Sequence, residues 1–160
     1  MNIEYKKIDD SIYNKIVDEY GEWVKEQIHD FHIRNDTFTL AAMDGDIPAG
    51  FVCATPRALI YPLKNLKDAY IEDLEVHENY RRQGIGQHLI ESCEDWARKS
   101  GFRQIRTHSS DNAVEAINMW RKLNYGLCPH DYHEYEPETD EYKNLFSGYW
   151  VAKILNPSAY

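Results

Sequence analysis

Residues 81–86, with the sequence RRQGIG, have the residue types and spacing of a loop that binds an anion. They follow an extended apolar run, residues 71–76, and precede an amphipathic run, residues 87–98, so they join a strand to the start of a helix. Gly84 and Gly86 let the backbone curl closely around a ligand because they carry no Cβ. The first-turn N–H groups of the following helix and its dipole then favour negative charge at this point.

Two well-known phosphate-binding motifs do not fit this loop. The dinucleotide-binding fingerprint needs a third glycine where this chain has Leu89, and a Walker loop needs a Gly-Lys-Ser/Thr ending that the chain lacks. The alternative interpretation is a plain turn in which Arg81 and Arg82 are solvated charges. The six residues alone do not distinguish an anion site from a turn, so the surrounding sequence is needed to choose between these interpretations.

Three carboxylates, Glu72, Asp73 and Glu75, lie on the strand before the loop, where they could anchor a cation or accept a proton. Strict alternation would place Asp73 and Glu75 on one face of the strand and Glu72 on the other, unless a bulge intervenes. A solvated or salt-bridged charge is the alternative for each of them, and we prefer it for Glu75.

The loop and its surroundings resemble the GNAT superfamily of acyl-CoA-dependent N-acyltransferases over roughly residues 70–125. The central motif of that family is Gln or Arg, two residues, Gly, one residue, then Gly or Ala, and it follows a strand that ends in an apolar residue, any residue and Val. A second family signature, Asn…Ala…Tyr-x-Lys-Leu-Gly-Phe, comes later in the chain. The matching residues are Arg81, Gly84 and Gly86 in the motif, Leu74 and Val76 at the strand end, and Asn112, Ala116 and residues 120–125 (WRKLNY) in the second signature.

The resemblance implies an α+β fold, with a mixed and mostly antiparallel sheet that splays at its central parallel strand pair and with helices on both faces. It also implies acetyl-CoA as cosubstrate and no metal. The residues expected to bind the cosubstrate are Leu74, Val76, Arg81, Arg82, Gln83, Gly84, Ile85, Gly86, Gln87, Asn112 and Trp120.

The implied reaction is attack of an amine on a thioester, for which the amine must first lose a proton. Several small-molecule members of the family carry a Glu four residues before the Val, and Glu72 occupies that position, so we rank it first as base or ammonium anchor and Asp73 second. His108, at the end of the next strand, could relay a proton through water, with a surface or hydrogen-bonded role as the alternative. Trp120 stands where many members have a tyrosine acid, and an indole N–H cannot replace that acid, so Trp120 is either a wall of the cosubstrate site or a core residue.

The acceptor is expected to be a small cationic amine of aminoglycoside, streptothricin or polyamine type. The pattern is nearest to aminoglycoside 6′-N-acetyltransferases and streptothricin acetyltransferases, and aromatic and acidic side chains together suit a cation. The residues proposed for this pocket are Tyr20, Trp23, Glu72, Asp131 and Glu134, with Asp30 and His32 nearby. A protein N-terminal or lysine acetyltransferase and a non-catalytic acyl-CoA-binding regulatory domain remain as alternatives.

Composition is typical of one globular domain over residues 1–160, in which 18 basic and 27 acidic residues give a net charge of −9. That charge argues against a nucleic-acid partner. Cys53, Cys93 and Cys128 lack metal-site spacing, and we expect them to have packing roles. Without a signal peptide or a membrane-length apolar stretch, we expect a cytoplasmic protein with no membrane partner. Homodimers are frequent in the family, but no residue of this chain fixes the oligomeric state.

The elements that must position these residues follow from hydrophobic periodicity and from turn signals. Residues 56–66 give no clear signal. Ser11 is expected to cap the first helix and Gly21 to separate it from a second, while Gly101 is expected to end the helix after the loop. The strands at 37–43 and 49–55 are expected to form a hairpin around Asp44, Gly45 and Asp46. The remaining expected elements are strands at 3–8, 69–76, 104–108, 127–135 and 149–155, and a helix at 112–123.

Overall fold

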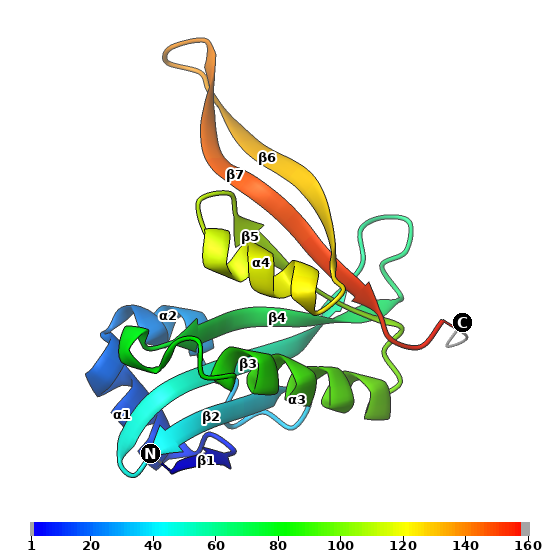
Figure 1. The fold of residues 1–160 in the computed structure, drawn as a ribbon. Coiled ribbons are helices and arrows are strands. Elements are labelled where there is room, and N and C mark those ends of the chain that lie inside the picture. The colour runs from blue at the N-terminus through cyan, green and yellow to red at the C-terminus, as the bar shows by residue number, and fades with distance from the viewer. Residues whose placement is uncertain (1, 158–160) are drawn as a thin grey trace. The chain divides into compact units, whose positions relative to one another are not determined.

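The computed structural model describes residues 2–157, which form two compact units (Figure 1). Of these residues, 2–105 and 155–157 belong to the first unit and 106–154 to the second. The elements are β1 (Ile3–Lys6), α1 (Asp10–Tyr20), α2 (Trp23–Ile28), β2 (Phe38–Asp44), β3 (Ile47–Ala58), β4 (Lys67–Val76), the 3₁₀ turn η1 (Glu78–Tyr80), α3 (Ile85–Lys99), β5 (Gln104–Ser110), α4 (Val114–Lys122), β6 (Gly126–Glu136) and β7 (Glu141–Ile154). That residues 1–160 form a single domain stays a prediction.

The first unit contains four antiparallel strands in the order β1-β2-β3-β4. β2 and β3 form the predicted hairpin, in which Asp44 pairs with Ile47 and Gly45 takes a φ of 61° that costs a glycine little. β3 continues to Ala58 and β4 begins at Lys67. The stretch that the sequence left open therefore lengthens both strands and joins them by a loop.

Helices cover both faces of this sheet, with α1 and α2 on one face and α3 on the other (Figure 1). The core under α1 and α2 consists of Ile8, Ile12, Ile16, Val17, Val24, Ile28, Ala41, Met43, Phe51 and Cys53. On the α3 face, a Cβ at Gly50 would lie 2.8 Å from the carbonyl oxygen of Glu75 and 3.3 Å from Ile85 Cγ2. The missing side chain thus allows the start of α3 to pack closely against the sheet.

The ends of α1 correct one sequence prediction and confirm another. Asp9, and not Ser11, caps the helix, because its Oδ1 accepts a hydrogen bond from the N–H of Ile12 at 2.8 Å. Asp9 has the extended backbone that a cap requires, whereas Ser11 already lies in the first turn. Gly21 ends the helix with a φ of 102°, as the predicted break requires.

The start of β5 belongs to the first unit and lies beside the start of β4. The side-chain amide of Gln104 donates to Asp68 Oδ2 at 2.5 Å, and Asp68 is fully buried. Because α3 connects the two strands and both begin at this point, they run parallel, as the resemblance implies.

The second unit is built from the rest of β5, α4 and the long β6–β7 hairpin. β7 lies between β5 and β6, and its register with β6 runs from Gly126 opposite Ala152 to Glu136 opposite Glu141. β7 begins at Glu141 rather than at the predicted Tyr149. Residues 141–148 (EYKNLFSG) lack a regular alternation of apolar and polar residues, and pairing with β6 provides their ladder hydrogen bonds.

Cys53 and Cys93 are buried, as a packing role requires, and Cys128 is exposed. Burial raises the pKa of both buried thiols. In the described part of the chain, no three His, Cys, Asp or Glu residues gather as a group that could hold a metal ion. None of the described helices combines the length and apolar content that crossing a membrane demands.

Candidate functional site

The loop between β4 and α3 faces open space beside Gly84, where an added Cβ would meet no described atom within 4 Å. This residue is the N-cap of α3, and its φ of 84° is a left-handed conformation that favours glycine. The first bond of the helix runs from the N–H of His88 to the oxygen of Gly84 at 3.0 Å, so the amides of residues 85–87 precede the helical ladder. Among the described residues, none caps α3 with its side chain and none in its first turn is acidic. This geometry suits an anion.

The side chains of the loop fold back along the chain. Arg81 Nε donates to the carbonyl oxygen of Val76 at 3.1 Å. The side-chain amides of Gln83 and Gln87 donate to oxygens of their own loop and helix. Arg82 is exposed and has a φ of 60°, which is unusual for a residue with a side chain. The side-chain donors of Arg81, Gln83 and Gln87 are thus hydrogen-bonded within this segment of the chain.

A β-bulge in β4 brings the three carboxylates to one face of the sheet. The described register with β3 shifts at Glu72 and leaves this residue without a cross-strand partner. Asp73 and Glu75 lie opposite Cys53 and Phe51, which belong to the core under α1 and α2. Glu72 reaches that face as well, as its contacts with β3 show. The bulge that the sequence analysis left open is present, and strict alternation does not apply across it.

Glu72 is held by two residues of β3. Arg57 forms a bidentate ion pair with it, from Nε to Oε1 at 2.9 Å and from Nη2 to Oε2 at 2.5 Å, and the Thr55 hydroxyl also donates to Oε1. The guanidinium of Arg57 lies over the ring of Tyr70, 3.8 Å from its centroid. Both carboxylate oxygens of Glu72 are thus engaged. The sequence analysis missed Thr55 and Arg57, which only the register of the β3–β4 hairpin could have indicated.

Unlike Glu72, Asp73 has a carboxylate oxygen that is not engaged by a described residue. Its Oδ2 is buried and has no hydrogen-bond partner among the described residues. Burial and, to a smaller extent, the charge of Glu75 raise the pKa of Asp73 to about 7, against a lowering by the backbone amide of Leu74. A carboxylate with this pKa can accept and release a proton near neutral pH.

After the bulge, side chains at the end of β4 alternate regularly between the two faces of the sheet. Glu75 is half-buried, and burial raises its pKa while the nearby Arg81 guanidinium opposes the rise. Leu74 and Val76 lie opposite Val52 and Gly50 and so point to the α3 face. Two of the predicted cosubstrate-binding residues therefore lie on the face opposite to the carboxylates.

Tyr20 and Trp23 lie at the junction of α1 and α2. The Tyr20 hydroxyl donates to the carbonyl oxygen of Pro48 at 3.3 Å, and its ring packs edge-on against Phe51. Burial raises the pKa of this hydroxyl, and the charge of Glu75 adds to the rise. Trp23 is exposed and donates from Nε1 to the carbonyl oxygen of Tyr20 at 2.6 Å. The structure thus brings Tyr20 near the carboxylate face, as an acceptor pocket would require.

The remaining predicted site residues belong to the second unit. His108 contacts Trp150, with ring centroids 3.4 Å apart, and stacks on His130 at 5.5 Å. Asn112 is exposed, and its side-chain oxygen accepts from the Ser110 hydroxyl at 2.7 Å. The roles of His108 and Asn112 stay predictions.

Trp120 is buried in the second unit. Its ring packs edge-on against Tyr125, with centroids 4.9 Å apart. These contacts match the core alternative for Trp120. Asp131 is exposed on β6, and Glu134 lies on the same strand, although its side chain is outside the described part of the structure.

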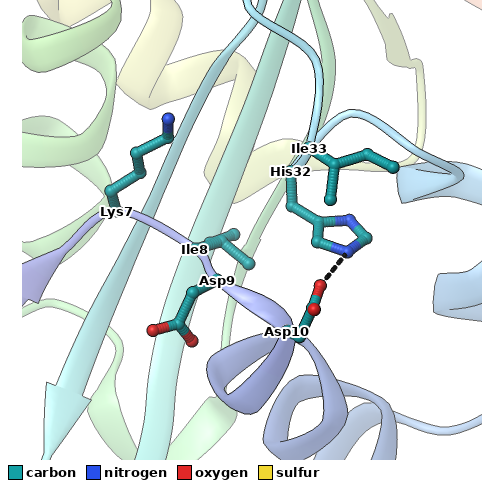
Figure 2. Close-up of a pocket in the computed structure, with 6 residues that line it drawn as sticks. All are labelled: Lys7, Ile8, Asp9, Asp10, His32 and Ile33. Carbon is teal, nitrogen blue, oxygen red and sulfur yellow. Dashed lines mark hydrogen bonds and ion pairs between the residues drawn. The ribbon is translucent and has the colours of Figure 1, made fainter.

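A hollow of about 400 Å³ lies at the start of α1, lined by Lys7, Ile8, Asp9, Asp10, His32 and Ile33 (Figure 2). His32 stacks on Tyr13 and its Nε2 lies 3.1 Å from Asp10 Oδ1. Of the predicted acceptor residues, only the secondary candidate His32 lines this hollow. His32 thus contacts the start of α1 in this structure.

The chain is similar in sequence to known acetyltransferases. The family model described as acetyltransferase (GNAT) family matches residues 4–125. A streptothricin acetyltransferase of Streptomyces lavendulae is 30% identical over 105 residues, which cover 66% of this chain and 52% of that protein. Streptothricin acetyltransferase A of Bacillus subtilis (strain 168) is 28% identical over 57 residues, or 36% of this chain and 33% of that protein. The matched segments thus span about half of the first relative's length and about a third of the second's.

Solved structures share the fold over nearly the whole chain. NAA60 of Arabidopsis thaliana in complex with a bisubstrate analogue has a TM-score of 0.73 at 19% identity, covering 98% of this chain and 100% of that one. The ribosomal-protein-S18-alanine N-acetyltransferase from Escherichia coli has a TM-score of 0.66 at 15% identity, covering 97% and 95%. These similarities confirm the predicted α+β fold class.

Proposed function

Because the chain belongs to the acetyltransferase (GNAT) family, we propose that it transfers an acetyl group from acetyl-CoA to a primary amine of a small cationic molecule, by direct attack in a ternary complex. An aminoglycoside, a streptothricin or a polyamine represents the acceptor class. The observation that carries this proposal is the face of β4 on which Glu72, Asp73 and Glu75 gather, because it joins negative charge to a carboxylate that titrates near neutrality.

The residues at the start of α3 fit the cosubstrate. The first-turn amides of residues 85–87, which precede the helical hydrogen bonds, the helix dipole and the absence of an acidic first turn among the described residues suit a diphosphate. Acetyl-CoA would supply the acetyl group as a thioester. In this proposal the loop holds the diphosphate through its backbone, and the roles of Arg81, Arg82 and Asn112 remain secondary.

Asp73 is the proposed base. An amine with a pKa near 10 arrives as an ammonium ion, so its nitrogen cannot attack until a group of the protein takes a proton. Asp73 Oδ2 is buried, unpartnered among the described residues and part of a carboxyl whose pKa lies near 7. The sequence-based ranking put Glu72 first as base or ammonium anchor, but its bidentate pair with Arg57 engages both oxygens, which disfavours the base role and leaves that of an anchor.

Glu75 and Tyr20 complete the acceptor side in the first unit. Glu75 adds negative charge beside Asp73 and so attracts the ammonium group. Tyr20 offers a ring to the same region, but its hydroxyl is bonded to Pro48 and its raised pKa makes it a poor proton donor. The thiolate of coenzyme A has a conjugate-acid pKa of roughly 8 to 9, as for a free thiol, and can leave without a tyrosine acid.

The experiment that tests this function measures thiol release from acetyl-CoA with a panel of acceptors. The panel contains aminoglycosides, streptothricin and polyamines, and it is paired with peptides that carry a free N-terminus or a lysine. We expect turnover with at least one small polyamine-like acceptor and none with the peptides. Turnover confined to the peptides would identify a protein acetyltransferase. Tight acetyl-CoA binding without transfer to any amine would identify a regulatory acyl-CoA-binding protein.

A further inference from the structure

The loop between β3 and β4 exposes a group of large apolar side chains. Ile60 and Tyr61 are 83% and 79% exposed, and Leu63 is 49% exposed. Among the described residues, Ile60 and Tyr61 are the two most exposed large hydrophobic side chains. Single exposed residues of this kind are ordinary on protein surfaces, but three within four positions form an apolar patch, and such patches mark interaction sites.

The backbone of this loop is already hydrogen-bonded. The N–H of Leu59 donates to the oxygen of Leu66 at 3.0 Å, that of Leu63 to Ile60 at 2.8 Å and that of Leu66 to Leu63 at 2.9 Å. The loop is therefore a preformed turn that presents apolar side chains while its own polar groups are partly satisfied. Entry into an apolar boundary requires that property, because unsatisfied backbone groups are costly there.

The charges around the loop are positive in an otherwise acidic chain. Residues 57–67 contain three basic residues and no acidic one, whereas the chain as a whole has a net charge of −9. Arg57 is neutralised by Glu72. Lys64 and Lys67 are the other two cations of this segment. Asp36 interacts electrostatically with Lys67, but its carboxylate is paired with Arg34 through hydrogen bonds of 2.9 and 2.8 Å.

We infer that the loop of residues 59–66 is a peripheral anchor for an anionic lipid membrane, with Ile60, Tyr61 and Leu63 entering the headgroup boundary and Lys64 and Lys67 contacting anionic headgroups. Apolar side chains next to lysines are the combination that such surfaces bind. A specific protein interface buries about 800 Å² on each partner, which a four-residue tip cannot supply. This inference departs from the sequence-based expectation of no membrane partner, which rested on the lack of a signal peptide and of a membrane-length apolar stretch.

Vesicle flotation of the full chain tests the inference. Vesicles of phosphatidylcholine alone are compared with vesicles that also contain phosphatidylserine, at low and at high salt. We expect binding to the anionic vesicles that weakens with salt, and an affinity at least tenfold lower for the double variant Ile60→Ser/Tyr61→Ser. Lys64→Gln and Lys67→Gln should each lower the affinity for the anionic vesicles about fivefold.

Two matched controls keep the test specific. Ile33→Ser removes an apolar side chain that is 67% exposed elsewhere in the same unit, and Lys99→Gln removes an exposed charge at the end of α3. Both should bind vesicles as the unchanged protein does, and circular dichroism melting should show that all variants fold. Absent binding, equal binding to neutral vesicles, or binding insensitive to the double change would overturn the inference. A dimer in sedimentation that the double change dissociates, without vesicle binding, would assign the loop to a second copy instead.

Discussion

The glycine loop before α3 and the carboxylate face of β4 differ in what fixes their geometry. In the loop, the left-handed Gly84 and the helix start it precedes are adjacent in sequence, and the donors are backbone amides. On β4, the arrangement depends on a one-residue bulge and on side chains of another strand, among them Arg57. The residues of the proposed anion site are consecutive in sequence, so the sequence alone can indicate them. Choosing the proposed base among the three acids of β4 requires the folded sheet.

The change Asp73→Asn should have the largest effect on this comparison. It removes the proposed base while keeping the size of the side chain, so we expect kcat/KM to fall by about 100- to 10,000-fold. Acetyl-CoA binding measured by calorimetry should be unchanged, because the anion loop lies elsewhere. A loss of less than tenfold would place the base at another residue.

The change Gly84→Asp should affect the other half of the site. A carboxylate beside the first-turn amides repels the diphosphate and removes charge-assisted hydrogen bonds, so acetyl-CoA affinity should fall by about 100-fold. Gly84→Asn separates bulk from charge, and it should weaken binding less.

A matched control for the backbone strain is Gly101→Asp at the other end of α3. Gly101 has a φ of 80°, and an added Cβ there also meets no described atom within 4 Å. Equal affinity losses at the two positions, measured by calorimetry, would show that helix distortion and not the anion site is responsible.

The pH dependence of kcat/KM should report the raised pKa of Asp73. A base must be deprotonated, so activity should fall about tenfold per unit as the pH drops below about 7 and level off above it. Carbon NMR of labelled aspartate, compared with Asp73→Asn, would measure this titration without relying on turnover. An acid limb near pH 4 would contradict the proposed environment of Asp73.

The smallest effect is expected from Glu72→Gln. Its carboxylate is engaged by Arg57 and Thr55, so we expect a change of less than tenfold in kcat and a higher KM for the cationic acceptor. Initial rates over a range of acceptor concentrations separate the two parameters. If the loss in kcat exceeds that of Asp73→Asn, the original sequence-based ranking is correct.

Much of the fold could be predicted because its signals are local. Hydrophobic periodicity located the strand before the loop and the helix after it, and Gly21 and Gly45 marked chain reversals. The misses share a cause. The cap at Asp9 and the long extension of β7 depend on the backbone of the folded chain and on a partner strand, which no window of sequence contains.

The candidate site divides along the same line. Arg81, Gly84 and Gly86 were identifiable because their spacing itself creates the turn and the helix start. The exposed turn at Ile60 and the engagement of Glu72 by Arg57 were not identifiable, since burial and cross-strand contact are properties of the packed structure.

By itself, the sequence determined the family motif, the glycine loop before a helix and the presence of three acids on one strand, because these follow from residue types at short separations. Only the tertiary structure decided that Glu72 is paired with Arg57 and that Asp73 has a buried oxygen without a hydrogen-bond partner among the described residues. The physical reason is that a carboxyl group acquires its pKa from the solvent it loses and the charges it meets, and both are set by residues distant in sequence.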